Sequence, residues 1–141
     1  MARFPVTRRG MLADDRGASV VEFAMMSVLL IVLLFAVLQV AIFMYARNIV
    51  AASAADGARY AANDGIDERS GGDRANKLIR AGLNKSVANR IPCTGWPSTD
   101  VRSGLAIATV HCAGQLPMLL LPFHLPITID VTSSALKEGR S

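Results

Sequence analysis

The sequence predicts an α+β chain with a long N-terminal transmembrane helix that extends outside the membrane, a second amphipathic helix and a small antiparallel sheet of two or three strands. Three patterns support this prediction: a long apolar run near the N-terminus, a helical period in the middle of the chain, and an alternating β-branched segment near its end. With 141 residues in total, about 95 remain outside the membrane helix, enough for one small domain.

The apolar run contains no charged residue between Glu22 and Arg47. About 24 residues in a helix extend about 36 Å, which exceeds a hydrocarbon core of about 30 Å. We therefore expect residues 18–46 to form a transmembrane helix. A cleaved export signal is the alternative, because residues 7–12 resemble a twin-arginine motif, but the apolar core of such signals is only about 7–15 residues long.

The flanks of the run predict its orientation. Four arginines precede it, and cationic flanks stay on the cytoplasmic side of a membrane. This places the N-terminus in the cytoplasm, one span in the inner (cytoplasmic) membrane, and the C-terminal part outside. The four are Arg3, Arg8, Arg9 and Arg16.

A glycine and a glutamate mark the start of the run. Gly17 is followed by Ala18, and Glu22 is the fifth residue after the glycine. This arrangement resembles the processing site of type IV prepilins, which a prepilin peptidase cuts after the glycine. The resemblance implies that residues 1–17 are a cytoplasmic leader and that Glu22 pairs with the new amine of Ala18. An ordinary interfacial carboxylate at a helix N-terminus is the alternative for Glu22.

Residues 16–62 as a whole are similar to the TadE-like minor pilins of tight-adherence (Tad) pili, because an alanine-rich series follows the membrane helix and closes in Gly57-Ala58-Arg59-Tyr60-Ala61. The resemblance implies a membrane-anchored minor pilin or pseudopilin that acts in assembly of an adhesion pilus. It also implies its partners: the prepilin peptidase, other minor pilins, the Tad assembly platform and the lipid bilayer. Whether the chain enters the filament or stays in the membrane is left open.

The helical extension at residues 47–63 carries alanines at intervals of three and four residues, which line one face with methyl groups. Such a face allows another helix to approach closely, although alanine also has high helix propensity by itself. An alternative function follows from this face, namely an unprocessed single-pass scaffold that recruits envelope partners through it. The face consists of Ala51, Ala54, Ala55, Ala58, Ala61 and Ala62.

Residues 64–141 are expected to form a small extracytoplasmic α+β head. The stretch Asn63 to Asp73 is rich in glycine and acids and is predicted to be a linker. Asp73 is a plausible N-cap for an amphipathic helix over residues 74–89, whose basic face is solvated or contacts lipid headgroups or an acidic partner.

Two strands are expected in the head, at Val101 to Cys112 and at Pro126 to Ser134. Cys93 lies in a turn-rich approach to the first strand. In an oxidising compartment an even number of cysteines favours a disulfide, here Cys93 to Cys112 closing a loop of about 20 residues, with two free thiols as the alternative. The apolar stretch Leu116 to Pro126 is too short and too rich in proline to cross a membrane, so it either faces a partner or the membrane edge, or is buried.

No catalytic set is recognisable, and we expect no enzymatic activity and no cofactor. Cys93, His111 and Cys112 are too few donors for a closed zinc site, and neighbouring residues of a strand point to opposite faces, so no metal is expected. The basic residues form no cluster interleaved with aromatic residues, and we expect no nucleic-acid partner.

Overall fold

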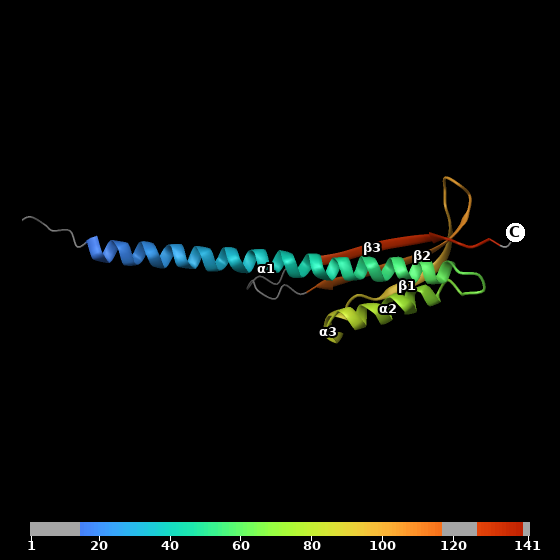
Figure 1. The fold of residues 1–141 in the computed structure, drawn as a ribbon, viewed down its shortest axis with the longest axis horizontal. Helices are drawn as coiled ribbons and strands as arrows, with labels where there is room; N and C mark the ends of the chain where they lie inside the picture. Colours follow the sequence, from blue (N-terminus) through green and yellow to red (C-terminus); the bar gives the residue numbers. More distant parts are fainter. Residues whose placement is uncertain (1–14, 117–126, 140–141) are drawn as a thin grey trace, which may run out of the picture. The chain divides into compact units, whose positions relative to one another are not determined.

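The computed structural model describes residues 15–116 and 127–139, with side chains from Ser19 onward. It contains three helices and three strands in these residues (Figure 1). The predicted α+β class is confirmed, with a long apolar helix, a second helix and a three-stranded antiparallel sheet. In chain order the elements are α1 (Asp15–Ala62), α2 (Ser70–Gly82), α3 (Lys85–Ala88), β1 (Cys93–Thr99), β2 (Ala106–Leu116) and β3 (Ile127–Leu136).

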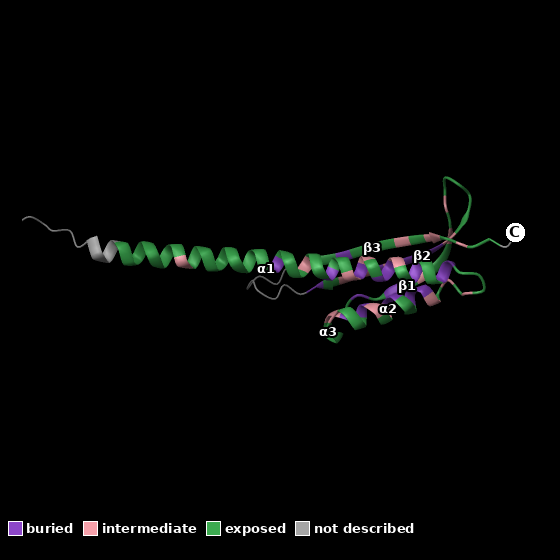
Figure 2. Cartoon of the chain, in the orientation of Figure 1, coloured by how far each residue is buried: buried purple, intermediate pink, exposed green. Residues whose placement is uncertain are grey.

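The chain divides into two compact units, residues 1–36 and residues 37–141. In the first unit the described residues are the N-terminal part of α1, and their large apolar side chains are exposed (Figure 2). Phe23 is 74% exposed and Leu34 is 64% exposed. Among the described residues, one helical stretch, Ser19–Ala62, is long and apolar enough to cross a membrane.

The second unit holds the sheet, whose strand order is β1-β2-β3 with antiparallel neighbours. In the register, Cys93 lies opposite Cys112, and Ile107 lies opposite Leu136. The C-terminal part of α1 and helix α2 lie beside this sheet (Figure 1). Residues of both helices and of all three strands share one buried cluster, so these elements form a single core.

Small side chains dominate this core. On α1, Ala46, Val50, Ala54 and Ala58 recur every fourth residue and are at most 4% exposed. This spacing places them on one helical face. They pack in a cluster with α2 and the sheet, and short side chains let these layers approach closely. The larger members of the core are Ile79, Ile91, Val110 and Ile129.

Glycines mark the point where α1 and α2 meet. A methyl group on Gly57 would collide with the carbonyl oxygen of Gly71, and one on Gly71 would lie 2.8 Å from the carbonyl oxygen of Gly57. A methyl group on Gly72 would lie 2.8 Å from the backbone nitrogen of Gly95 in β1. The prediction of a linker over residues 63–73 is therefore wrong for its last part. Ser70 to Asp73 are helical because these glycines allow α2 to contact both α1 and the sheet.

The expected N-cap at Asp73 is also wrong, since Asp73 lies inside the first turn of α2. Arg69 holds the N-cap position and forms no side-chain capping bond. The amphipathic segment predicted as one helix over residues 74–89 is interrupted after Gly82, and α3 begins at Lys85 with Asn84 as its cap, whose side chain accepts a hydrogen bond from the backbone of Ser86.

Strand β1 was not predicted, since its sequence contains Gly95 and Pro97. The strand lies at an edge of the sheet, where a proline without an N–H is tolerated. The expected strand at Val101 to Cys112 begins later, at Ala106, because residues 100–105 form a turn. There the side chain of Asp100 accepts hydrogen bonds from the backbone and hydroxyl of Ser103, and Gly104 has a φ of 69°.

Candidate functional site: the long helix and the packing of its second half

The predicted processing residues lie in the first turns of α1, which begins at Asp15, upstream of Gly17. Residues 18 and 22 are four positions apart along this helix, which is about one turn. Glu22 is exposed.

The one serine side chain in the apolar run after Glu22, that of Ser27, forms a hydrogen bond within the helix. The hydroxyl of Ser27 donates a hydrogen bond of 2.8 Å to the carbonyl oxygen of Phe23, one turn earlier. Such back-bonding allows a hydroxyl to stay in an apolar environment without an unpaired donor. This half of α1 is therefore compatible with lipid or with the apolar surface of other helices.

The alanine series lies within the second unit and packs against its own chain. Ala54, Ala58, Ala61 and Ala62 are at most 5% exposed, and Ala51 and Ala55 are half-buried. The first two belong to the main core, whereas Ala61 and Ala62 pack with Ala108 of β2. The head itself therefore covers most of this face. A scaffold that recruits partners through these alanines would have little exposed alanine surface to offer.

Gln39 is a site residue that the sequence analysis missed. It is 9% exposed, and its side-chain oxygen has no hydrogen-bond partner among the described residues. An unpaired buried oxygen of this kind costs about 1–3 kcal/mol. Gln39 lines a cavity of about 220 Å³ whose walls are almost entirely apolar. The sequence does distinguish this residue, since Gln39 is the one amide side chain between Glu22 and Arg47.

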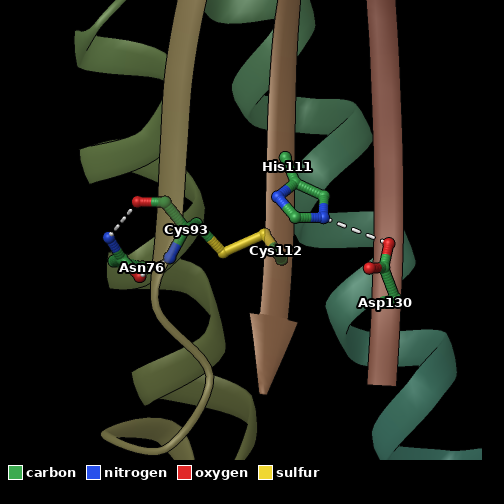
Figure 3. The surroundings of a disulfide bond; sticks show 5 residues. All are labelled: Asn76, Cys93, His111, Cys112 and Asp130. Atoms are coloured by element: carbon green, nitrogen blue, oxygen red, sulfur yellow. Dashed lines mark hydrogen bonds and ion pairs between the residues drawn. A yellow bond between two sulfur atoms is a disulfide. The ribbon is translucent and has the colours of Figure 1, made fainter. Parts of the chain in front are cut away.

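A disulfide joins Cys93 and Cys112 across β1 and β2 (Figure 3). Cys112 is fully buried and Cys93 is 5% exposed. The amide of Asn76 on α2 donates to the carbonyl oxygen of Cys93 at 3.0 Å and accepts from its backbone nitrogen at 2.9 Å. These two bonds fasten the start of the edge strand to α2, so the disulfide and Asn76 hold β1 from opposite sides.

The sheet carries a polar group beside the disulfide. His111 Nε2 lies 3.1 Å from a carboxylate oxygen of Asp130 on β3, and Trp96 packs edge-on against the His111 ring (Figure 3 for the His111–Asp130 pair). His111 does not approach the cysteines as a ligand, since they are bonded to each other. Within the described ranges, no group of three or more His, Cys, Asp or Glu side chains could hold a metal ion.

Ion pairs tie the ends of the head together. The Lys137 ammonium bonds the carboxylate of Glu68, and this bond, together with the backbone N–H of Glu68, lowers the pKa of Glu68. The backbone of Glu138 donates to the carbonyl oxygen of Ala62 at the end of α1. Arg74 on α2 pairs with Asp56 on α1 at 3.0 Å and lies over the Tyr60 ring.

The turn before β2 holds a second perturbed carboxyl group. The Ser103 hydroxyl, and then the backbone N–H of Arg102, lower the pKa of Asp100 by hydrogen bonding to its carboxylate. The predicted apolar segment at Leu116 to Pro126 begins in described structure, because Leu116 ends β2 and is 9% exposed. Residues 117–126 lie outside the described residues, so the two expectations for this segment stay predictions.

The model of the TadE-like protein family matches residues 17–59. Neither curated proteins nor solved structures give a match to the chain. The matched segment begins at the predicted processing glycine and ends in the Gly-Ala-Arg string, whereas α2, α3 and the sheet lie beyond it. The resemblance predicted from the sequence motifs is thus confirmed, because residues 17–59 of this chain match the TadE-like family.

Proposed function

We propose that the chain is a TadE-like minor pilin or pseudopilin, a membrane-anchored structural protein that acts in assembly of a Tad-type adhesion pilus. One observation carries the proposal. The family match runs from Gly17 through the apolar run into the alanine series, and all of these residues belong to the single helix α1. The proposed role is structural and requires neither a catalytic site nor a cofactor.

In this proposal α1 crosses the inner membrane with its N-terminus in the cytoplasm. The four N-terminal arginines support this orientation by the positive-inside rule. The disulfide is consistent with it, because disulfides persist in oxidising compartments outside the cytoplasm. The head, which contains both cysteines, then lies on the extracytoplasmic side.

The prepilin peptidase removes residues 1–17 in this scheme, and Glu22 pairs with the new amine of Ala18. The exposed apolar side chains of residues 19–36 then pack against lipid before assembly and against other minor pilins afterwards. The Tad assembly platform is the proposed partner that extracts the chain from the membrane.

The intact mass of the membrane-bound chain tests the processing step. We expect a mature form that begins at Ala18 in cells with an active prepilin peptidase and a full-length form after Gly17→Val. Gly10→Val is the matched control, since it places the same side chain elsewhere in the leader, and it should be processed normally. A mature chain that still begins upstream of Ala18 would contradict the proposal.

Pilus assembly provides the functional readout. Gly17→Val should abolish pili, whereas Gly10→Val should leave them unchanged. Assembly that persists with Gly17→Val would show that the chain acts without processing, as a membrane scaffold would.

A further inference from the structure

The described residues that line the cavity of Gln39 all belong to the second unit. Its walls come from α1, from the end of α2 and the start of the next helix, and from the residues where β2 ends and β3 begins. At about 220 Å³ it is larger than the roughly 150 Å³ apolar cavities that admit benzene. Apolar side chains that line it include Ile42, Phe43, Leu83 and Val87.

The cavity coincides with the end of the apolar run. Its α1 residues, Gln39 to Ala46, are the last two turns before Arg47. Because about 20 residues suffice to cross the hydrocarbon core, the residues from Phe23 to Ile42 complete the span. The cavity therefore lies where acyl chains meet headgroups, and Tyr45 is an aromatic residue typical of that depth. This step rests on the proposed membrane placement of α1.

Two exposed cations are immediate sequence neighbours of residues that line the cavity. No acidic residue occurs between Asp73 and Asp100, whereas this stretch contains five cations. One of them, Lys85, follows the lining residue Asn84, and Arg47 follows the lining residue Ala46; both are exposed. Cations next to a membrane surface attract anionic lipids. The others are Lys77, Arg80, Arg90 and Arg74, the last of which pairs with Asp56.

We propose that this cavity binds an anionic phospholipid, with an acyl chain between Phe43 and Val87 and the phosphate beside Arg47 and Lys85. Gln39 supplies the polar contact at the inner wall. Its amide offers an NH2 group as donor and a carbonyl oxygen as acceptor to the ester and hydroxyl groups of the lipid, and rotation of the amide exchanges their positions. The apolar wall alone accepts any acyl chain, and the flanking cations select an anionic headgroup.

Native mass spectrometry tests this proposal on the full chain in detergent micelles that contain equal amounts of phosphatidylglycerol and phosphatidylethanolamine. We expect one retained lipid for each chain and about a fivefold preference for phosphatidylglycerol for each contributing cation. Lys85→Glu should reduce that preference by more than about fivefold, because it removes one cation and adds an anion. Arg102→Glu is the matched control, because Arg102 lies in the turn before β2, and it should leave the preference unchanged.

Two further variants test the cavity itself. Val87→Trp fills it and should release the lipid, whereas Leu105→Trp, on an exposed residue elsewhere, should not. Gln39→Leu, which keeps the side-chain size, should weaken retention without unfolding the head, as the fluorescence of Trp96 reports. Equal retention of the two lipids, a lipid retained fully by Val87→Trp, or a bound polypeptide in place of lipid would overturn the proposal. Carbonate extraction of membranes tests the placement of α1 separately. Failure of the membrane placement can therefore be distinguished from failure of the lipid site.

Discussion

The two halves of α1 share one backbone conformation but bury their side chains in opposite ways. Residues 19–36, the first half, expose nearly every large apolar side chain. Residues 37–62, the second half, bury small residues such as Ala54 and Ala58, which are at most 1% exposed. Large exposed apolar groups need a cover from outside the chain, either lipid or other helices. The small buried side chains of the second half are already covered by α2 and the sheet of the head. The comparison identifies residues 19–36 as the part of α1 whose large apolar side chains have no cover in the described chain.

The disulfide gives the first test of the second half, with the largest expected effect. Replacing both cysteines by alanine (Cys93→Ala with Cys112→Ala) should lower the free energy of unfolding of the head by about 3 kcal/mol, the loop-entropy value for a loop of this length. The fluorescence of Trp96, the single tryptophan, follows unfolding in guanidinium for the full chain in detergent. Val101→Ala, on a side chain that is 99% exposed, is the control. A midpoint equal to that of the control would show that the bond does not support the head.

The glycine contact between α1 and α2 gives the second test. Gly57→Ala should destabilise the head by about 1–3 kcal/mol, because the added methyl group forces the two backbones apart. Gly139→Ala is the matched control, since no atom lies within 4 Å of a methyl group there. The same unfolding assay measures both. If Gly57→Ala is as stable as Gly139→Ala, the close approach of α1 and α2 is wrong.

Asn76 gives the third test, on the fastening of β1. Asn76→Ala removes both bonds to the Cys93 backbone. It should cost about 1–2 kcal/mol, since a partly buried N–H and C=O lose their partner. Asn89→Ala, on an exposed residue after α3, should change stability little. Equal unfolding midpoints for the two variants would refute a role for Asn76 in holding the strand.

The Glu68 to Lys137 pair gives the smallest effect, and it depends on pH. The pKa of Glu68 is lowered in the folded state from its ordinary value of 4.5. The pair therefore contributes stability above about pH 4.5, and this contribution is lost as the pH falls through the lowered pKa. Lys137→Met should be less stable than the unaltered chain at pH 7, and the difference should shrink at pH 3. A difference that is constant with pH would rule out the ion pair as its cause.

The first half of α1 was predictable from the sequence because hydropathy and length are sufficient for it. The alternation around Ile129 and Val131 likewise predicted β3, since one face of that strand is buried. The disulfide needed the compartment inferred from the arginines as well as the cysteine count. Each of these features depends on local pattern or composition.

The remaining features depend on contacts between distant segments. Gly71 and Gly72 are typical of a linker when they are considered locally, yet they lie in α2 because Gly57 and Gly95 approach them. Gly95 and Pro97 disfavour a strand, and an edge position beside β2 tolerates them. Gln39 was overlooked because a single amide does not interrupt an apolar run, and its importance follows from the head residues that bury it.

The central claim is that the first half of α1 lies in lipid and that the head lies outside the membrane. Single cysteines introduced by Leu30→Cys and Val101→Cys, each exposed in the isolated chain, can be labelled in spheroplasts with a maleimide that does not cross membranes. We predict rapid labelling at residue 101 and labelling at residue 30 only after the membrane is dissolved. Equally fast labelling at both positions in intact spheroplasts would contradict the account.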